Sequence, residues 1–267
     1  MRAILLVAGA VFRESVRDRV PYSMVLFAVL LMAASYLISQ MTAGQDLKMI
    51  KDLGLASIAI FGLLIAVFIG IGLVSKEVER KSVYGLLSKP ISRSQFILGK
   101  FLGLMLTLVI NIGAMTAAFY GVLFYMKTVN PAVEAAALTP TLDPRLMVAI
   151  ALILSELMVV TALALFFSTF SSPLLATVLT LGLWVAGHFN ADLRNFESVI
   201  DNAAVAWIAR VSYYVLPNLA PFDVKAEVVH GIPVTLRHVG LTLAYAAIYT
   251  GVLLTAAVAI FRRRDFK

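Results

Sequence analysis

Residues Gly72–Gly103 read GLVSKEVERKSVYGLLSKPISRSQFILGKFLG, a short mixed-charge segment between two long apolar stretches. The rest of the chain has the composition of a protein that faces lipid. Of its 267 residues, 61% are hydrophobic and only 14% are charged, whereas an average soluble domain carries about 25% charge. A chain of this size cannot hide so many apolar side chains from water. The sequence therefore predicts an all-α integral membrane protein with one transmembrane domain over residues 1–267.

The net charge of +7 does not indicate nucleic acid binding. The basic residues flank the apolar runs, where the anionic head groups of lipids lie. The chain contains no cysteine, which excludes disulfides, thiolate metal sites and cysteine nucleophiles. Its histidines, His188, His230 and His238, lack the spacing of metal ligands, so we expect neither a metal nor a cofactor in this chain.

Uncharged runs predict six membrane-spanning helices, because a helix of about 20 apolar residues crosses ~30 Å of hydrocarbon. The longest run, Leu146–Ala191, is interrupted only by Glu156. It is long enough for two helices that turn at Ser168–Pro173, since proline suits the first turn of a new helix. The predicted spans are residues 21–41, 54–75, 96–126, 146–168, 172–189 and 239–261.

The lysines and arginines predict the orientation of the chain. With both termini in the cytoplasm, 14 of the 22 basic residues fall on that side, as the positive-inside rule requires. Residues 1–19 are predicted to form an amphipathic helix on the inner membrane surface. Its apolar face would hold Ile4, Leu5, Ala8, Val11, Phe12 and Val16. A simple extension of the first span is the alternative.

The charged segment between the second and third spans, residues 76–93, predicts a short cytoplasmic helix over Lys76–Leu87. Lys89-Pro90 should end this helix, because the residue before a proline avoids helical geometry. Ser92 and Gln95 then have the form of a capping box that opens the third span. Gly99 and Gly103 at the base of that span form a GxxxG pattern, which permits close helix approach. A solvated loop that merely obeys the positive-inside rule remains an equal alternative on composition alone.

Residues 190–237 precede the last span and are too patterned for a plain outer loop. Apolar residues recur at helical spacing from Phe196 to Val211, which predicts an amphipathic helix ended by Pro217. A turn at Asn218–Asp223 and a short helical piece over Val224–His230, closed by Gly231, should follow. Such a segment either packs as a lid or contacts a molecule that the protein handles. Trp184 and Trp207 fit an aromatic belt at the membrane interface.

Two polar residues are predicted near the middle of the bilayer. Glu156 lies about 16 Å along its helix from Arg145, and Asn111 lies at a similar depth beyond Lys100. A charge at that depth costs on the order of 2.5–3.5 kcal/mol, so Glu156 should face protein or water. We expect Glu156 and Asn111 to form a hydrogen bond within one subunit or across a dimer. Glu156 either belongs to a polar path or gate through the membrane or makes a structural bond between helices.

The charged segment resembles that of the ABC-2 permeases, the membrane subunits of type 2 ATP-binding-cassette exporters. The resemblance rests on a glutamate after the second span, on Gly85-Leu86-Leu87-Ser88-Lys89-Pro90-Ile91-Ser92-Arg93 and on Gly99-Lys100. The predicted topology and the basic tail that begins at Arg262 extend it over the whole chain. The sequence is similar to the small permeases of the nitrous-oxide-reductase maturation type.

This resemblance implies that residues 76–93 form a coupling helix that docks on a separate nucleotide-binding ATPase subunit. By position, the implied contact residues are Glu77, Glu79, Arg80, Gly85, Leu86, Lys89, Pro90 and Arg93. The resemblance also implies a second permease copy, in a homodimer or heterodimer, and a bacterial inner membrane. The chain lacks the GxxxxGK[ST] motif of phosphate-binding loops, so ATP and Mg²⁺ should bind to the partner and this chain should not be an enzyme.

The resemblance leaves the task of such an assembly open, because it implies either the export of a solute or the transmission of force to a periplasmic protein. A secondary transporter is the rival from another class, but the sequence contains no pair of broken helices or repeat that would favour it. A structural membrane protein without an ATPase partner is the third alternative.

Overall fold

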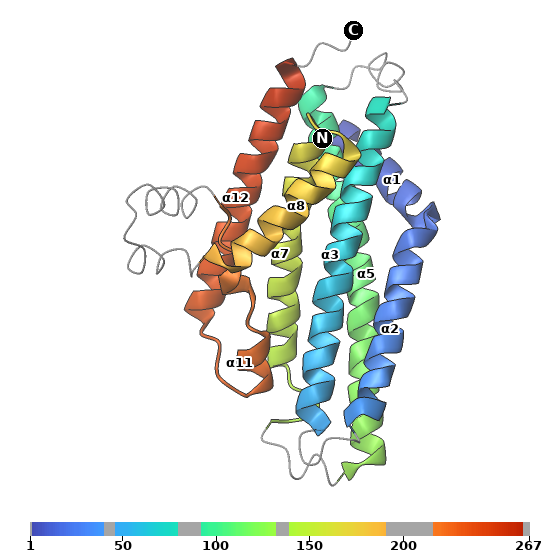
Figure 1. Cartoon of the computed structure of the whole chain (residues 1–267), viewed down its shortest axis with the longest axis vertical. Coiled ribbons are helices and arrows are strands. Elements are labelled where there is room, and N and C mark those ends of the chain that lie inside the picture. Colours follow the sequence, from blue (N-terminus) through green and yellow to red (C-terminus); the bar gives the residue numbers. More distant parts are fainter. Residues whose placement is uncertain (1, 40–45, 80–91, 132–138, 191–215, 264–267) are drawn as a thin grey trace.

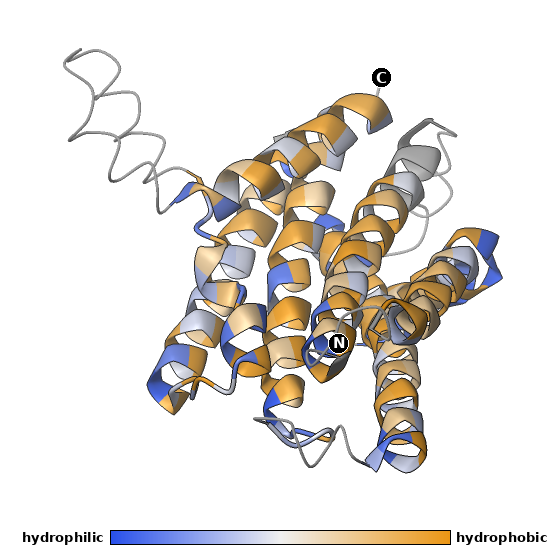
Figure 2. Cartoon of the chain, turned by 60° about the horizontal axis from the view of Figure 1, so that its bottom comes forward, coloured by the Kyte–Doolittle hydropathy of each residue, from blue (hydrophilic) through white to orange (hydrophobic). Residues whose placement is uncertain are grey.

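The computed structural model describes residues 2–39, 46–79, 92–131, 139–190 and 216–263. Every regular element in these ranges is helical, which agrees with the predicted all-α class. The helices pack side by side in an elongated bundle (Figure 1). Most residues along the helices are hydrophobic (Figure 2), as expected for helices that face lipid tails rather than water.

Five helices are long and apolar enough to cross a membrane, by length and composition. An additional helix, α8 (Pro173–His188), is apolar but has 16 residues. At 1.5 Å per residue it is about 24 Å long, shorter than the ~30 Å of the hydrocarbon core. The chain is therefore a multi-pass membrane protein, and the sixth span remains a prediction. The five long helices are α2 (Arg19–Ser39), α3 (Asp46–Glu79), α5 (Arg93–Val129), α7 (Arg145–Ser168) and α12 (Leu236–Arg263).

Helices α3, α5 and α7 form the centre of the bundle, with α2 and α12 at its sides (Figure 1). The start of α1 (Arg2–Arg17) and the end of α12 lie at one end of the bundle, together with the end of α3 and the start of α5. We call this the terminal end. The opposite, distal end holds the start of α7 and the short helix α11 (Lys225–Val229).

Three glycines on α3 allow it to approach its neighbours closely. A Cβ on Gly54 would enter the ring of Phe119 on α5, and one on Gly62 would lie 2.6 Å from Leu157 Cδ1 on α7. A Cβ on Gly70 would lie 3.3 Å from the side chain of Ala164. In a membrane, where lipid tails are as apolar as leucine, small residues stabilise helix pairs through close packing. These glycines thus set the spacing of the central helices.

Helix α1 packs against the base of α5 at the two glycines of the GxxxG pattern. A Cβ on Gly103 would lie 2.7 Å from both Ala8 O and Val11 Cβ, and one on Gly99 would lie 2.6 Å from Val7 Cβ. The buried face of α1 consists of Val7, Ala8, Val11 and Ser15. Leu5 and Val16 of the predicted apolar face are exposed, and contact of this face with the membrane surface stays a prediction. Asp18 separates α1 from α2, so α1 is not a continuous extension of the first long helix.

The short-range predictions agree with the structure. Ser92 and Gln95 form the reciprocal capping box, and Pro173 opens α8. Gly231 adopts a φ of 76° directly after His230, the C-cap of α11. A 3-10 turn, η1 (Ala220–Phe222), lies within the predicted turn. The predicted helix over Phe196–Val211 lies outside the described residues.

Candidate functional site

Most residues implied to contact an ATPase have no described side chain. The backbone of α3 continues as helix through Glu77 to Glu79, whose side chains are not described. Arg80, Gly85, Leu86, Lys89 and Pro90 also lie outside the described residues. Of that set, Arg93 alone has a described side chain, as the first residue of α5.

The guanidinium of Arg93 binds the last turn of α12. Its Nη1 donates hydrogen bonds to Phe261 O at 2.9 Å and to Arg262 O at 2.8 Å. The last carbonyls of a helix lack partners within the helix and carry a partial negative charge. An arginine that donates to them therefore caps α12 while it ties the end of α12 to the start of α5.

Aromatic rings strengthen the same junction. Phe96, one turn into α5, stacks on Phe261 with ring centroids 5.9 Å apart and planes 16° apart. The Lys100 Nζ lies 4.8 Å from the centroid of the Phe96 ring, and its side chain is buried. A cation over an aromatic face away from water contributes more than the same pair in solvent. We call Arg93, Phe96, Phe261 and Arg262 the Arg93 clamp.

A second polar group lies inside the bundle around Glu156 on α7, which is 4% exposed. The indole Nε1 of Trp184 donates to Glu156 Oε1 at 2.6 Å. The Nε2 of His188 lies 3.5 Å from the same oxygen, and His188 Nδ1 is 3.0 Å from Trp184 O. Because a carbonyl can only accept, Nδ1 must carry a hydrogen there. The three residues therefore join α7 to the end of α8.

Glu156 and Asn111 do not form a hydrogen bond with each other within the described chain. The amide of Asn111 donates to Thr107 O one turn earlier on its own helix, at 2.7 Å, while Glu156 binds Trp184. The intrasubunit pairing expected from equal depth is thus wrong, because depth does not decide which faces of two helices meet. A bond between copies stays a prediction.

A buried lysine near the distal end was missed by sequence reasoning, which assigned it to a loop. Lys51 lies on α3 with no exposed surface. Its Nζ donates to Thr139 Oγ1 at 2.9 Å and to Pro140 O at 2.7 Å, and Asp143 attracts it electrostatically. The residues that bind it are 88 and 89 positions away in sequence, so no local pattern would have revealed this contact.

The segment before α12 closes onto α8. Leu219 N donates to Gly187 O at 2.9 Å, and a Cβ on Gly187 would lie 2.8 Å from Pro217 O. Lys225 and Asp223 form an ion pair at 3.0 Å, within electrostatic range of Glu156. The segment that leads into α12 is therefore bonded to the end of α8, the helix that carries Trp184 and His188.

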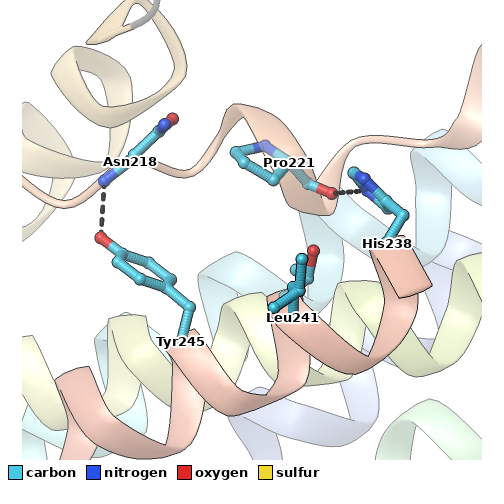
Figure 3. A pocket seen from close by; sticks show the side chains of 6 residues that line it. Asn218, Pro221, His238, Leu241 and Tyr245 are labelled. Carbon is cyan, nitrogen blue, oxygen red and sulfur yellow. Dashed lines mark hydrogen bonds between the residues drawn. The ribbon is translucent and has the colours of Figure 1, made fainter.

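A pocket of about 320 Å³ lies between this segment and the distal half of α12 (Figure 3). The backbone N–H of Asn218 donates to the Tyr245 hydroxyl at 2.9 Å, and His238 Nε2 lies 2.8 Å from Pro221 O. Both bonds tie α12 to the segment across the pocket. Its lining residues are Asn218, Pro221, His238, Leu241, Thr242 and Tyr245.

Among the described residues, no group of histidine, aspartate and glutamate side chains has the arrangement of a metal site. His188, His230 and His238 each bind a backbone carbonyl. These contacts give the three histidines structural roles.

Comparison with known proteins agrees with this architecture. A search among curated proteins finds no match to the chain. The family model for ABC-2 family transporter proteins matches residues 5–266, nearly the whole sequence. The match includes the Arg93 clamp, the Glu156 group and the pocket. The chain therefore belongs to the ABC-2 family of transporter proteins.

Proposed function

We propose that this chain is the membrane-spanning permease subunit of an ATP-binding-cassette exporter. A separate nucleotide-binding subunit would hydrolyse ATP, and this chain would couple the hydrolysis to export or to force transmission across the membrane. The observation that carries the proposal is the family match over residues 5–266. The sequence contains no phosphate-binding motif, which supports the assignment of ATP hydrolysis to a second polypeptide.

In this proposal, residues 76–93 at the terminal end dock on the ATPase in the cytoplasm of a bacterial cell. The contact residues would be Glu77, Glu79, Arg80, Gly85, Leu86, Lys89 and Pro90. Two copies of the chain would pair in the inner membrane, as in transporters of the nitrous-oxide-reductase maturation type. ATP and Mg²⁺ would bind to the ATPase, and no cofactor would bind to this chain.

The first test is the identity of the proteins that purify with a tagged copy of the chain from native membranes in mild detergent. We expect a soluble protein that carries a phosphate-binding loop. The variant Glu79→Lys should abolish its recovery, because it reverses a charge at the proposed contact. Glu14→Lys is the matched control, since Glu14 is an exposed glutamate on α1 and belongs to no proposed contact.

Recovery of the ATPase with Glu14→Lys but not with Glu79→Lys would support the docking site. A preparation that contains no ATPase, even after cross-linking, would contradict the proposal and favour a secondary transporter or a structural membrane protein. A periplasmic protein recovered in the same complex, without uptake or export of any solute in vesicles, would indicate force transmission.

A further inference from the structure

We propose that Arg93 is a positioning residue that makes the distal half of α12 follow the nucleotide state of the ATPase. This inference rests on the proposed function, since it requires an ATPase that acts on residues 76–93. The family resemblance implies that Arg93 contacts the ATPase directly. The geometry instead commits its Nη1 to Phe261 O and Arg262 O on α12.

The covalent connection gives the first step. Arg93 is the first residue of α5 and the last residue of the segment expected to dock on the ATPase. The capping box of Ser92 and Gln95 fixes the backbone on the N-terminal side of Arg93. A displacement of Ser92 therefore reaches Arg93 and the base of α5 through backbone that this capping box restrains.

The hydrogen bonds give the second step. Two charge-assisted bonds to adjacent carbonyls restrain both the position and the rotation of the α12 terminus. The Phe96–Phe261 stack lies beside them, with exposures of 8% and 2%. The bond to Phe261 O is partly buried, which strengthens it, whereas the bond to Arg262 O is exposed. Together with the ring stack, these bonds should make the end of α12 move with the base of α5.

The third step is the length of α12, which runs as one helix over 28 residues and contains no proline. It is about 42 Å long, and a helix without a proline or another identifiable interruption has no cause for a sharp kink. Its distal half lines the pocket and holds Asn218 and Pro221 through Tyr245 and His238. A rotation or shift at the terminal end should therefore alter the pocket.

The test uses the absence of native cysteine. Thr242→Cys introduces a single thiol at a pocket-lining position that is 4% exposed. In the complex with its ATPase in lipid nanodiscs, its reaction rate with a water-soluble maleimide is measured without nucleotide and with ATP plus vanadate. We expect the two rates to differ by at least about fivefold, the lower end of ordinary allosteric coupling.

Arg93→Gln in the Thr242→Cys background should bring the ratio of the two rates close to one, while the ATPase still purifies at the wild-type ratio. Arg93→Lys should give an intermediate ratio, since one ammonium keeps the charge without the planar fork of arginine. Arg13→Gln is the matched control. Arg13 is exposed and bonds Gly9 O within its own helix, so its loss should leave the ratio unchanged.

Three results would overturn the inference. Loss of the ATPase with Arg93→Gln would assign Arg93 to the docking contact. An unchanged rate ratio with Arg93→Gln, or no nucleotide response with Thr242→Cys alone, would show that α12 does not carry the signal. If the Arg93→Gln protein melts at a clearly lower temperature than the Arg13→Gln protein, the Arg93→Lys protein replaces it in the test. The inference then requires Arg93→Lys to lower the ratio of the two maleimide reaction rates. Absence of any ATPase from the wild-type complex would instead contradict the proposed function.

Discussion

The indole of Trp184 donates its hydrogen to Glu156 Oε1 at 2.6 Å, from α8 to α7. This bond explains how a carboxyl group is accommodated inside an apolar bundle. Glu156 receives the Trp184 hydrogen, and His188 approaches the same oxygen from one turn further along α8. Buried polar groups require such partners, because an unpaired one retains the full cost of its lost water.

Replacement of Glu156 should reveal this cost. Glu156→Leu leaves the Trp184 N–H without an acceptor, and we expect a loss of about 1–3 kcal/mol in unfolding free energy. Glu156→Gln keeps a carbonyl oxygen for Trp184 and should lose clearly less. Unfolding in detergent, followed by tryptophan fluorescence, measures both. Equal losses would mean that the Trp184 bond does not stabilise the contact between α7 and α8.

The close approach of α1 to α5 predicts opposite effects of the same substitution at two glycines. Gly103→Ala should destabilise the protein by about 1–3 kcal/mol, because the added methyl group collides with Ala8 O and Val11. Gly121→Ala on the same helix has nothing within 4 Å and should stabilise it by up to about 1 kcal/mol through helix propensity. Thermal melting in one detergent compares them. If both variants become more stable, α1 does not pack as described.

Local sequence signals predicted the structural features that depend on a few neighbouring residues. The Ser92–Gln95 capping box, the turn before Pro173 and the left-handed Gly231 each arise from a few consecutive positions. Composition and apolar run length similarly predicted the long helices. The apolar run that contains α8 was harder to interpret, since such a run does not by itself show whether its helix is long enough to cross a membrane.

Contacts between distant segments were not predictable in the same way. The depth of Glu156 was apparent from its distance to Arg145, but equal depth wrongly selected Asn111 as its partner within the chain. One signal was available, because Trp184 and His188 are four residues apart and thus share a helix face. The binding of Arg93 to the end of α12 spans 168 and 169 positions and had no counterpart in the local sequence.

Lys51 should contribute more to the stability of the protein than Lys48. Lys51→Met removes one buried and one partly buried hydrogen bond and the positive charge near Asp143, so we expect a loss of at least about 1–3 kcal/mol. Lys48→Met, at a partly exposed position on the same helix, should change stability by less than about 0.5 kcal/mol. Thermal unfolding distinguishes them, and similar losses would contradict a special role for Lys51.

The charge on Asp143 provides a separate test of the same contact. Asp143 Oδ2 is buried without a hydrogen-bond partner among the described residues, and Lys51 attracts this carboxylate electrostatically. Asp143→Asn removes the charge and keeps an oxygen for Arg145 N, which Oδ1 accepts at 2.9 Å. The double variant with Lys51→Met should therefore lose less stability than the sum of the two single variants. Strict additivity in the melting data would show that the two groups act independently.

Tyr245 holds the distal segment by accepting the backbone hydrogen of Asn218. Tyr245→Phe keeps the ring but removes this acceptor, and one such bond contributes about 0.5–1.5 kcal/mol. The amide of Asn218 should then exchange with deuterium up to roughly tenfold faster, as measured by mass spectrometry on peptides that contain Asn218. Tyr22→Phe is the control, since the Tyr22 hydroxyl binds Val16 O on the α1–α2 side of the bundle and its loss should leave Asn218 unaffected. Unchanged exchange in Tyr245→Phe would mean that the segment is held at the pocket by other contacts, such as that of His238 with Pro221.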